Sequence, residues 1–221
     1  YHKHIHCGEG GMVVTNDNTL ADRVALIRNH AESVVGGMGI KEIANMIGFN
    51  FRMTEIEAAI AHEQLDLLDE VVAEKQRQAR ILDALLGSEP GMTIQAIPAN
   101  LESAYYVYPI RLDVARIPGG RERLIEKITG QVPLMGTYQN IHLLPMFQNK
   151  IAYGTGGFPW TVSDRNSEIS YRKGICPVAE ELFDHSFIGI PMCSYDFSDE
   201  EIHQIGASLR EAWRGIYSGQ P

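Results

Sequence analysis

The chain has 221 residues, with 19 lysines and arginines against 28 aspartates and glutamates, and a formal net charge of −9. This acidic balance argues against a nucleic-acid or membrane-surface role, because phosphate surfaces select basic patches. Its three cysteines do not suggest a disulfide framework, so a reducing cytoplasm is the simplest setting. No apolar run approaches the roughly 20 residues of a membrane span.

The first part of the chain predicts one strand and one helix. Met12-Val13-Val14-Thr15 is a short apolar run with β-branched residues and predicts a buried strand. Turn and capping residues at 16–18 precede a helical pattern over Leu20–Arg28. The glycines within 31–47 predict a loop.

A longer helical pattern begins at Thr54, where Glu55 and Glu57 supply the acidic first turn that suits a helix N-terminus. Apolar residues at helical spacing continue to Leu86, which is long for one globular helix. We therefore expect a break or a domain link near residues 68–70.

The remainder alternates strand and helix signals, which predicts an α/β chain. Pro109 places the strand that contains it at a sheet edge or a bulge, because proline lacks a backbone donor. The expected elements are a strand over 104–112, a short helix within 119–130, a long loop over 148–175, a helix over 177–183 and a last helix capped by Ser198 and ending near Ile216.

The most metal-like feature is a cluster of His2, His4, His6 and Cys7. Alternate residues of a strand share a face, so three imidazoles could converge. The competing interpretation, which we favour, is a terminal cluster that is solvated or packs against sequence upstream of Tyr1, since structural zinc sites need a second ligand pair and none is visible.

Four stretches of the chain, in this order, resemble the DegT/DnrJ/StrS family of sugar aminotransferases. The most specific is Gly48-Phe49-Asn50-Phe51-Arg52-Met53-Thr54-Glu55. The others are Lys3 with the Gly8-Glu9-Gly10-Gly11 turn and Met12–Asp17, then Leu26-Ile27-Arg28-Asn29-His30, and a diffuse set at 108–112, 141–145 and 177–182.

The resemblance implies a fold class as well. The chain would be α/β, the C-terminal part of a fold-type I pyridoxal-phosphate (PLP) aminotransferase. Residues 1–68 would be the end of the large PLP-binding domain, and residues 69–221 the small C-terminal domain. Since Tyr1 opens directly into matched sequence, we expect a fragment whose upstream half would complete the cofactor site.

Site residues follow from the resemblance, position by position. Lys3 would be the catalytic residue that carries PLP as a Schiff base and then moves protons. Asn50 would reach the cofactor phosphate of the neighbouring subunit, with a turn or capping role as its alternative. Arg52 would bind a carboxylate or phosphate of the substrate, or form an ion pair. His142 would lie near the substrate, or be a hydrogen-bonded loop histidine. No metal ligand is implied.

The implied reaction is transamination of a keto sugar, nucleotide-linked, with glutamate or glutamine as amino donor, in a homodimer with shared sites. One alternative is a PLP-dependent sugar dehydratase of the same fold, in which histidine replaces the lysine. Lys3, six residues before Glu9, favours the aminotransferase. A non-enzymatic regulator that kept the fold is a second alternative, and a metal-binding fragment is a third.

Overall fold

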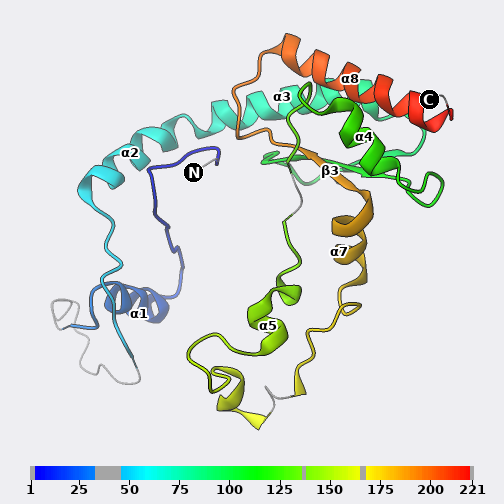
Figure 1. The fold of residues 1–221 in the computed structure, drawn as a ribbon. Helices are drawn as coiled ribbons and strands as arrows, with labels where there is room; N and C mark the ends of the chain where they lie inside the picture. The colour runs from blue at the N-terminus through cyan, green and yellow to red at the C-terminus, as the bar shows by residue number, and fades with distance from the viewer. Residues whose placement is uncertain (1–2, 33–45, 136–137, 165–167, 220–221) are drawn as a thin grey trace. The chain divides into compact units, whose positions relative to one another are not determined.

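A computed structural model describes residues 3–32, 46–135, 138–164 and 168–219 (Figure 1). The chain divides into two compact units, Tyr1–Val71 and Val72–Pro221, each described here by itself. This division falls within the first turn of helix α3 (Leu68–Leu86), close to the boundary expected at residue 68.

The helices and strands are mixed along the chain. In the first unit the helices are α1 (Asn18–Arg28) and α2 (Glu55–Asp66). The second unit contains most of α3, strands β1 (Met92–Ile94), β2 (Tyr108–Leu112) and β3 (Phe187–Ile190), and helices α4 (Gly120–Ile128), α5 (Pro145–Asn149), α7 (Pro177–Glu181) and α8 (Asp199–Tyr217), with single turns at Ile141–Leu143, Trp160–Val162 and Leu182–Ser186.

Capping chemistry sets the starts of α1 and α2, as the sequence predicts. The Asp17 carboxylate accepts hydrogen bonds from the backbone amides of Thr19 (2.8 Å) and Leu20 (3.1 Å). Thr54 and Glu57 form a reciprocal capping box at the start of α2. The predicted break is confirmed, since the Leu67 amide turns back to the Gln64 carbonyl (3.2 Å) before α3 begins.

The predicted strand over Met12–Thr15 is wrong for the described structure. This segment is irregular, and Met12, Val13 and Val14 are 83%, 68% and 83% exposed. A strand needs a neighbour to complete its hydrogen-bond ladder. Among the described residues of the first unit, no segment pairs with this one. β-Branched composition alone therefore does not make it a strand.

The second unit is built on a three-stranded antiparallel sheet in the order β1-β2-β3. The pairing places Met92 opposite Leu112, and Ile110 opposite both Ile94 and Ile188. β2 is shorter than the strand predicted over 104–112, because Tyr105 adopts a left-handed backbone (φ 51°) that interrupts an extended chain.

Pro109 lies in the central strand, so the prediction of an edge strand is wrong. Its partner on β3 is Gly189, whose carbonyl instead accepts the Met135 amide (2.8 Å) on the opposite side. In an antiparallel ladder this makes Pro109 and Gly189 a non-hydrogen-bonded pair. The missing Pro109 donor thus faces the β1 side, where β1 has already ended at Ile94.

Helices α3, α4 and α8 cover one face of the sheet, and the core lies between (Figure 1). Alternation along β2 buries Tyr108, Ile110 and Leu112 and leaves Arg111 exposed. Each fully buried aliphatic side chain contributes about 1.5–3 kcal/mol. The fully buried apolar side chains of these helices are Ala79, Leu82 and Leu86 from α3, Leu124 and Ile128 from α4, and Ile202, Leu209 and Trp213 from α8.

Helix α8 begins and ends where the sequence predicts. Ser198 and Glu201 form a second capping box, and the helix runs to Tyr217. A Cβ at Gly206 would lie 2.5 Å from Cδ1 of Leu85, so the glycine lets α8 approach α3 closely. The Arg77 guanidinium of α3 also pairs with Asp199 in the first turn of α8.

The segment predicted as a loop over 148–175 is more ordered than a simple loop in its described part. The rings of Phe147, Trp160 and Tyr171 pack together, and the Trp160 indole donates to the Tyr171 hydroxyl (3.0 Å). The helix predicted over 177–183 is regular only to Glu181, where a wider π-helical turn follows.

Candidate active site

Two of the sequence motifs meet at the C-terminal end of α1. The Phe49 amide donates to the Ile27 carbonyl (2.8 Å), the His30 amide donates to the Phe49 carbonyl (2.9 Å), and the Phe51 amide donates to the Arg28 carbonyl (3.0 Å). These bonds form a short antiparallel bridge that fixes the extended backbone on either side of Asn50.

Gly48 allows the two segments to come this close. A Cβ at this position would lie 2.0 Å from the backbone nitrogen of Ala31 and 2.0 Å from the carbonyl carbon of His30. His30 and Ala31 themselves turn through the left-handed region (φ 63° and 54°). Only glycine fits against this rigid backbone, which explains why the motif opens with one.

Asn50 and Arg52 lie on this bridged segment, and both are exposed. The Arg52 guanidinium donates from Nη1 to Oδ1 of the buried Asn29 (2.7 Å). That partner is a neutral amide, and arginine has five N–H donors, so the positive charge and most donors remain available to an anion. The Asn50 amide adds a neutral donor two residues away on the same extended segment.

Lys3 is exposed in a bend that precedes the glycine turn. Gly8 adopts a left-handed backbone (φ 96°) in that turn. A Cβ at Gly10 would lie 2.5 Å from Cε of Met53, so the turn packs directly against the residue after Arg52. Within the first unit, the turn that follows Lys3 and the segment that carries Asn50 and Arg52 are thus in contact.

His142 lies in the second unit, on the turn Ile141–Leu143. Its side chain is 12% exposed, and Nε2 lies 2.8 Å from Oε1 of Glu180. The histidine is therefore hydrogen-bonded and mostly buried. In the sequence, Glu180 stands out only as part of the run 177–182 that resembles the family. The one available signal was its place in the first turn of the helix beginning at Pro177.

Glu180 is a buried carboxylate with several donors. Its Oε1 accepts from the amides of Gly174 (2.8 Å) and Cys176 (3.2 Å), and its Oε2 lies 2.7 Å from the Gly174 nitrogen. Burial raises the pKa of the Glu180 carboxyl, but the hydrogen bonds from His142 and these amides outweigh burial. The pKa therefore lies below its ordinary value of 4.5, and the group is ionised at neutral pH.

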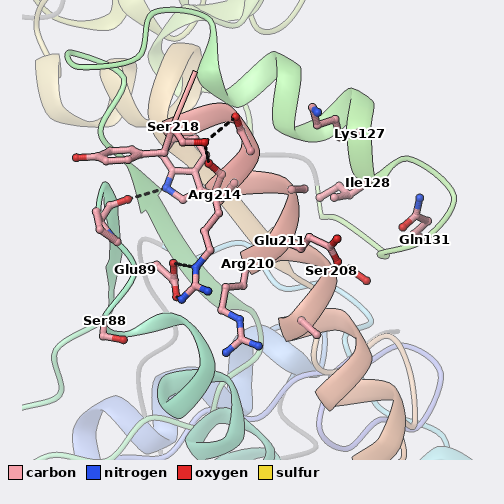
Figure 2. A pocket seen from close by; sticks show the side chains of 16 residues that line it. Ser88, Glu89, Lys127, Ile128, Gln131, Ser208, Arg210, Glu211, Arg214 and Ser218 are labelled. Atoms are coloured by element: carbon pink, nitrogen blue, oxygen red, sulfur yellow. Dashed lines mark hydrogen bonds and ion pairs between the residues drawn. The ribbon is translucent and has the colours of Figure 1, made fainter. Parts of the chain in front are cut away.

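A hollow of about 1200 Å³ lies elsewhere, around the C-terminal half of α8 (Figure 2). Two of its charged lining residues pair with each other, since Arg214 donates to both oxygens of the buried Glu89 (2.8 and 2.6 Å). Lys3, Asn50, Arg52 and His142 do not line it. This hollow therefore contributes nothing to the candidate site.

Within the part of the chain that the structure describes, no group of three or more His, Cys, Asp or Glu side chains could hold a metal ion. His2, from the cluster noted in the sequence, is outside the described residues. The described helices include none that is both long and apolar enough to span a membrane. Cys7, Cys176 and Cys193 are not joined to one another by disulfide bonds.

Comparison with known proteins gives consistent matches. The family model of the DegT/DnrJ/EryC1/StrS aminotransferase family matches residues 1–172. L-glutamine:2-deoxy-scyllo-inosose aminotransferase of Streptoalloteichus tenebrarius is 32% identical over 94% of this chain and 50% of its own length. GDP-perosamine synthase of Escherichia coli O157:H7 is 29% identical over 95% of this chain and 49% of its own.

The solved structure of S. venezuelae DesV matches 90% of this chain and 45% of its own, at 18% identity and a TM-score of 0.66. This likeness confirms the expected fold class, a mixed helix and sheet arrangement shared with DesV. The chain spans about half the length of these relatives.

Proposed function

Because the chain belongs to the DegT/DnrJ/EryC1/StrS aminotransferase family, we propose that it takes part in PLP-dependent transamination of a nucleotide-linked keto sugar, with glutamate or glutamine as amino donor. The observation that carries the proposal is the bridged segment of the first unit. This segment presents Asn50 and Arg52 and packs through Met53 against the glycine turn that follows Lys3.

The residues of the first unit fit PLP chemically. PLP, when bound, supplies an electron sink for the carbon that loses or gains the amine. Lys3 offers an exposed primary amine that would hold the cofactor covalently and, once released, would carry protons as base and acid. Asn50 offers a neutral amide donor suited to a phosphate oxygen, on a backbone that the bridge to α1 keeps in place.

Arg52 would bind the anionic end of a substrate. Its guanidinium is held through one donor by Asn29, which orients the planar fork without neutralising it. A carboxylate of the amino donor or a phosphate of a nucleotide-linked sugar matches the remaining donors. His142 would contact the sugar.

The names of these two relatives support transamination as the reaction class. One names L-glutamine as donor and 2-deoxy-scyllo-inosose as acceptor, and the other names a GDP-linked amino sugar as product. We extend the proposal to a homodimer in which Asn50 serves the cofactor of the neighbouring subunit.

The test is borohydride reduction in the presence of PLP, followed by peptide mapping. It is run on the 221-residue chain and on the longest natural protein that contains it. We expect a pyridoxyl group on Lys3 in the longer protein, lost in Lys3→Gln and kept in Lys127→Arg, a matched change at another exposed lysine. Bound cofactor without an adduct on Lys3 would contradict the proposal and favour the dehydratase.

A further inference from the structure

Glu180 decides which nitrogen of His142 carries a proton. An ionised carboxylate only accepts hydrogen bonds, so the Nε2 of His142, 2.8 Å from Oε1, must be the donor. The neutral ring is then the Nε2–H tautomer, and Nδ1 keeps its lone pair. Among the described residues, the hydrogen bond to Glu180 is the one that His142 makes through its ring.

The backbone of His142 is held as well as its ring. The Gln148 amide donates to the His142 carbonyl (2.7 Å) and to the Tyr171 carbonyl (2.6 Å). Tyr171 is in turn fixed by the Trp160 indole (3.0 Å). The turn that carries His142 is therefore attached through Gln148 to the segment before α7, and through the ring of His142 to Glu180 in α7.

The carboxylate itself has little freedom to move. It is 7% exposed, and the amides of Gly174 and Cys176 hold both of its oxygens in front of α7. A polar group held in this way transmits a fixed orientation to the side chain that it binds. Three of the four hydrogen bonds to this carboxylate come from backbone amides, and the fourth comes from the ring of His142. The side chain that Glu180 orients is therefore His142.

We propose that Glu180 is a positioning residue for His142: it holds the imidazole as the Nε2–H tautomer and leaves Nδ1 to accept a hydrogen bond from a hydroxyl of the keto sugar. The assignment of the acceptor hydroxyl rests on the proposed function. The positioning of the ring does not, and the two are tested separately.

The positioning is tested on the full chain by nitrogen-15 and proton NMR of the histidine rings, with His142 assigned from a His142→Asn variant. We expect a slowly exchanging Nε2–H resonance for His142 and a non-protonated Nδ1. The resonance should vanish in Glu180→Ala. In Glu180→Gln, which keeps one acceptor oxygen at the position shared by His142 and the backbone amides, it should move upfield, because a neutral acceptor binds the proton less strongly.

Glu181→Gln is the matched control. It removes a carboxylate at the adjacent position of α7, whose partners are Ser186 and Arg111, and should leave the His142 resonance unchanged. A non-protonated Nε2 in the wild-type chain, or the same resonance in Glu180→Gln, would overturn the proposal. Because Glu180→Gln retains an acceptor, this comparison holds even if Glu180→Ala fails to fold.

The role in turnover is tested by a double-mutant cycle in the longest natural protein that contains these residues. The probe is 2-deoxy-scyllo-inosose with L-glutamine, the substrates named by a relative. Glu180→Gln should raise KM for the acceptor about tenfold with little change in kcat, and should have no further effect once His142→Asn is present. Additive effects would overturn the role.

The two proposals fail in different ways. If the wild-type protein does not aminate the probe, which is a keto cyclitol without a nucleotide, this result excludes that acceptor and leaves the nucleotide-linked keto sugar of the proposed function. The NMR comparison alone then decides whether Glu180 positions His142. If the protein turns over but the Nε2–H resonance does not depend on Glu180, the positioning proposal fails and the proposed function stands.

Discussion

The two units of the chain differ in how they bury their apolar residues. In the second unit, three strands and three helices enclose a shared core in which Trp213, Tyr108 and Leu209 are almost fully buried. Among the described residues of the first unit, Leu26 is the buried hydrophobic side chain, and Phe51 and Ile56 are 63% and 75% exposed.

This difference separates the residues that form the core from the candidate site residues of the first unit. The motif residues Lys3, Asn50 and Arg52 belong to the unit whose apolar surface is exposed, and such surface is typical of contact regions. The second unit contains the hydrophobic core described above. Substitutions in the two units should therefore have unequal effects on the free energy of unfolding.

The largest effect is expected at the centre of the second core. Trp213→Ala removes a fully buried ring and the hydrogen bond from its indole to the Pro90 carbonyl (2.8 Å), and should lower the free energy of unfolding by about 3–5 kcal/mol. Urea unfolding followed by circular dichroism measures it. Phe51→Ala, an exposed aromatic residue of the first unit, should change it by less than about 0.5 kcal/mol. Equal losses of unfolding free energy in the two variants would contradict the proposed difference between the units.

The next effect sharpens the comparison within the first unit. Gly48→Ala places a Cβ against the backbone of His30 and Ala31, which cannot yield as a flexible side chain would, and should cost about 1–3 kcal/mol. Hydrogen exchange at the Phe49 and Phe51 amides reports whether the bridge to α1 survives. Gly11→Ala, with open space around its Cβ, is the control and should leave both amides protected.

A smaller effect compares the same motif in both units. Ser198→Ala removes the capping box of α8 and should lower global stability by about 1 kcal/mol, because α8 is part of the core. Thr54→Ala removes the equivalent box of α2, which buries none of its residues. Hydrogen exchange should therefore show local fraying of α2 while the global transition stays unchanged. A shift of the global transition in Thr54→Ala would argue against this local effect.

The smallest expected effect is an acid dependence located mainly in the second unit. The Arg77 guanidinium lowers the pKa of Asp199 below its ordinary 3.8, and hydrogen bonds lower that of Glu180 below 4.5 despite burial. Since the folded pKa values are lowered, the unfolded chain binds protons first. This stabilisation is complete above about pH 4.5 and is lost as pH falls further.

Asp199→Asn checks this dependence. The variant should have a lower urea midpoint at pH 7 and a shallower fall in midpoint between pH 4.5 and pH 3, because one titrating group is gone. Asp69→Asn, at a residue outside this network, is the control. A slope identical to that of the wild-type chain in Asp199→Asn would show that the ion pair does not contribute.

Helix boundaries were predictable from the sequence because capping and periodicity are local. Asp17, Thr54 and Ser198 act at the helix starts that their positions predict, and the break after α2 occurs at Leu67. The strand signals were weaker. Pro109 fits a central strand because β1 ends one residue before the position where it would need a hydrogen-bond donor from residue 109. How far β1 pairs along β2 is not determined by the residues near Pro109.

The sequence also indicated some residues of the candidate site and not others. The motif around Asn50 and Arg52 was recognisable by its resemblance to the family, and the structure adds the physical reason for its glycine, which lies against the backbone of His30 and Ala31. Glu180 was missed, because its partner His142 is 38 residues away in the sequence and only folding brings the two together.

By itself, the amino-acid sequence determined the helix starts, the break after α2 and the family motifs, since these depend on side chains within a few residues of one another. Only the tertiary structure decided that Met12–Thr15 stays unpaired, that Pro109 lies in a central strand, and that Asn29 holds Arg52 while Glu180 holds His142. Each of these depends on which distant backbone or side chain completes a hydrogen bond, and such a partner is chosen only when the chain folds.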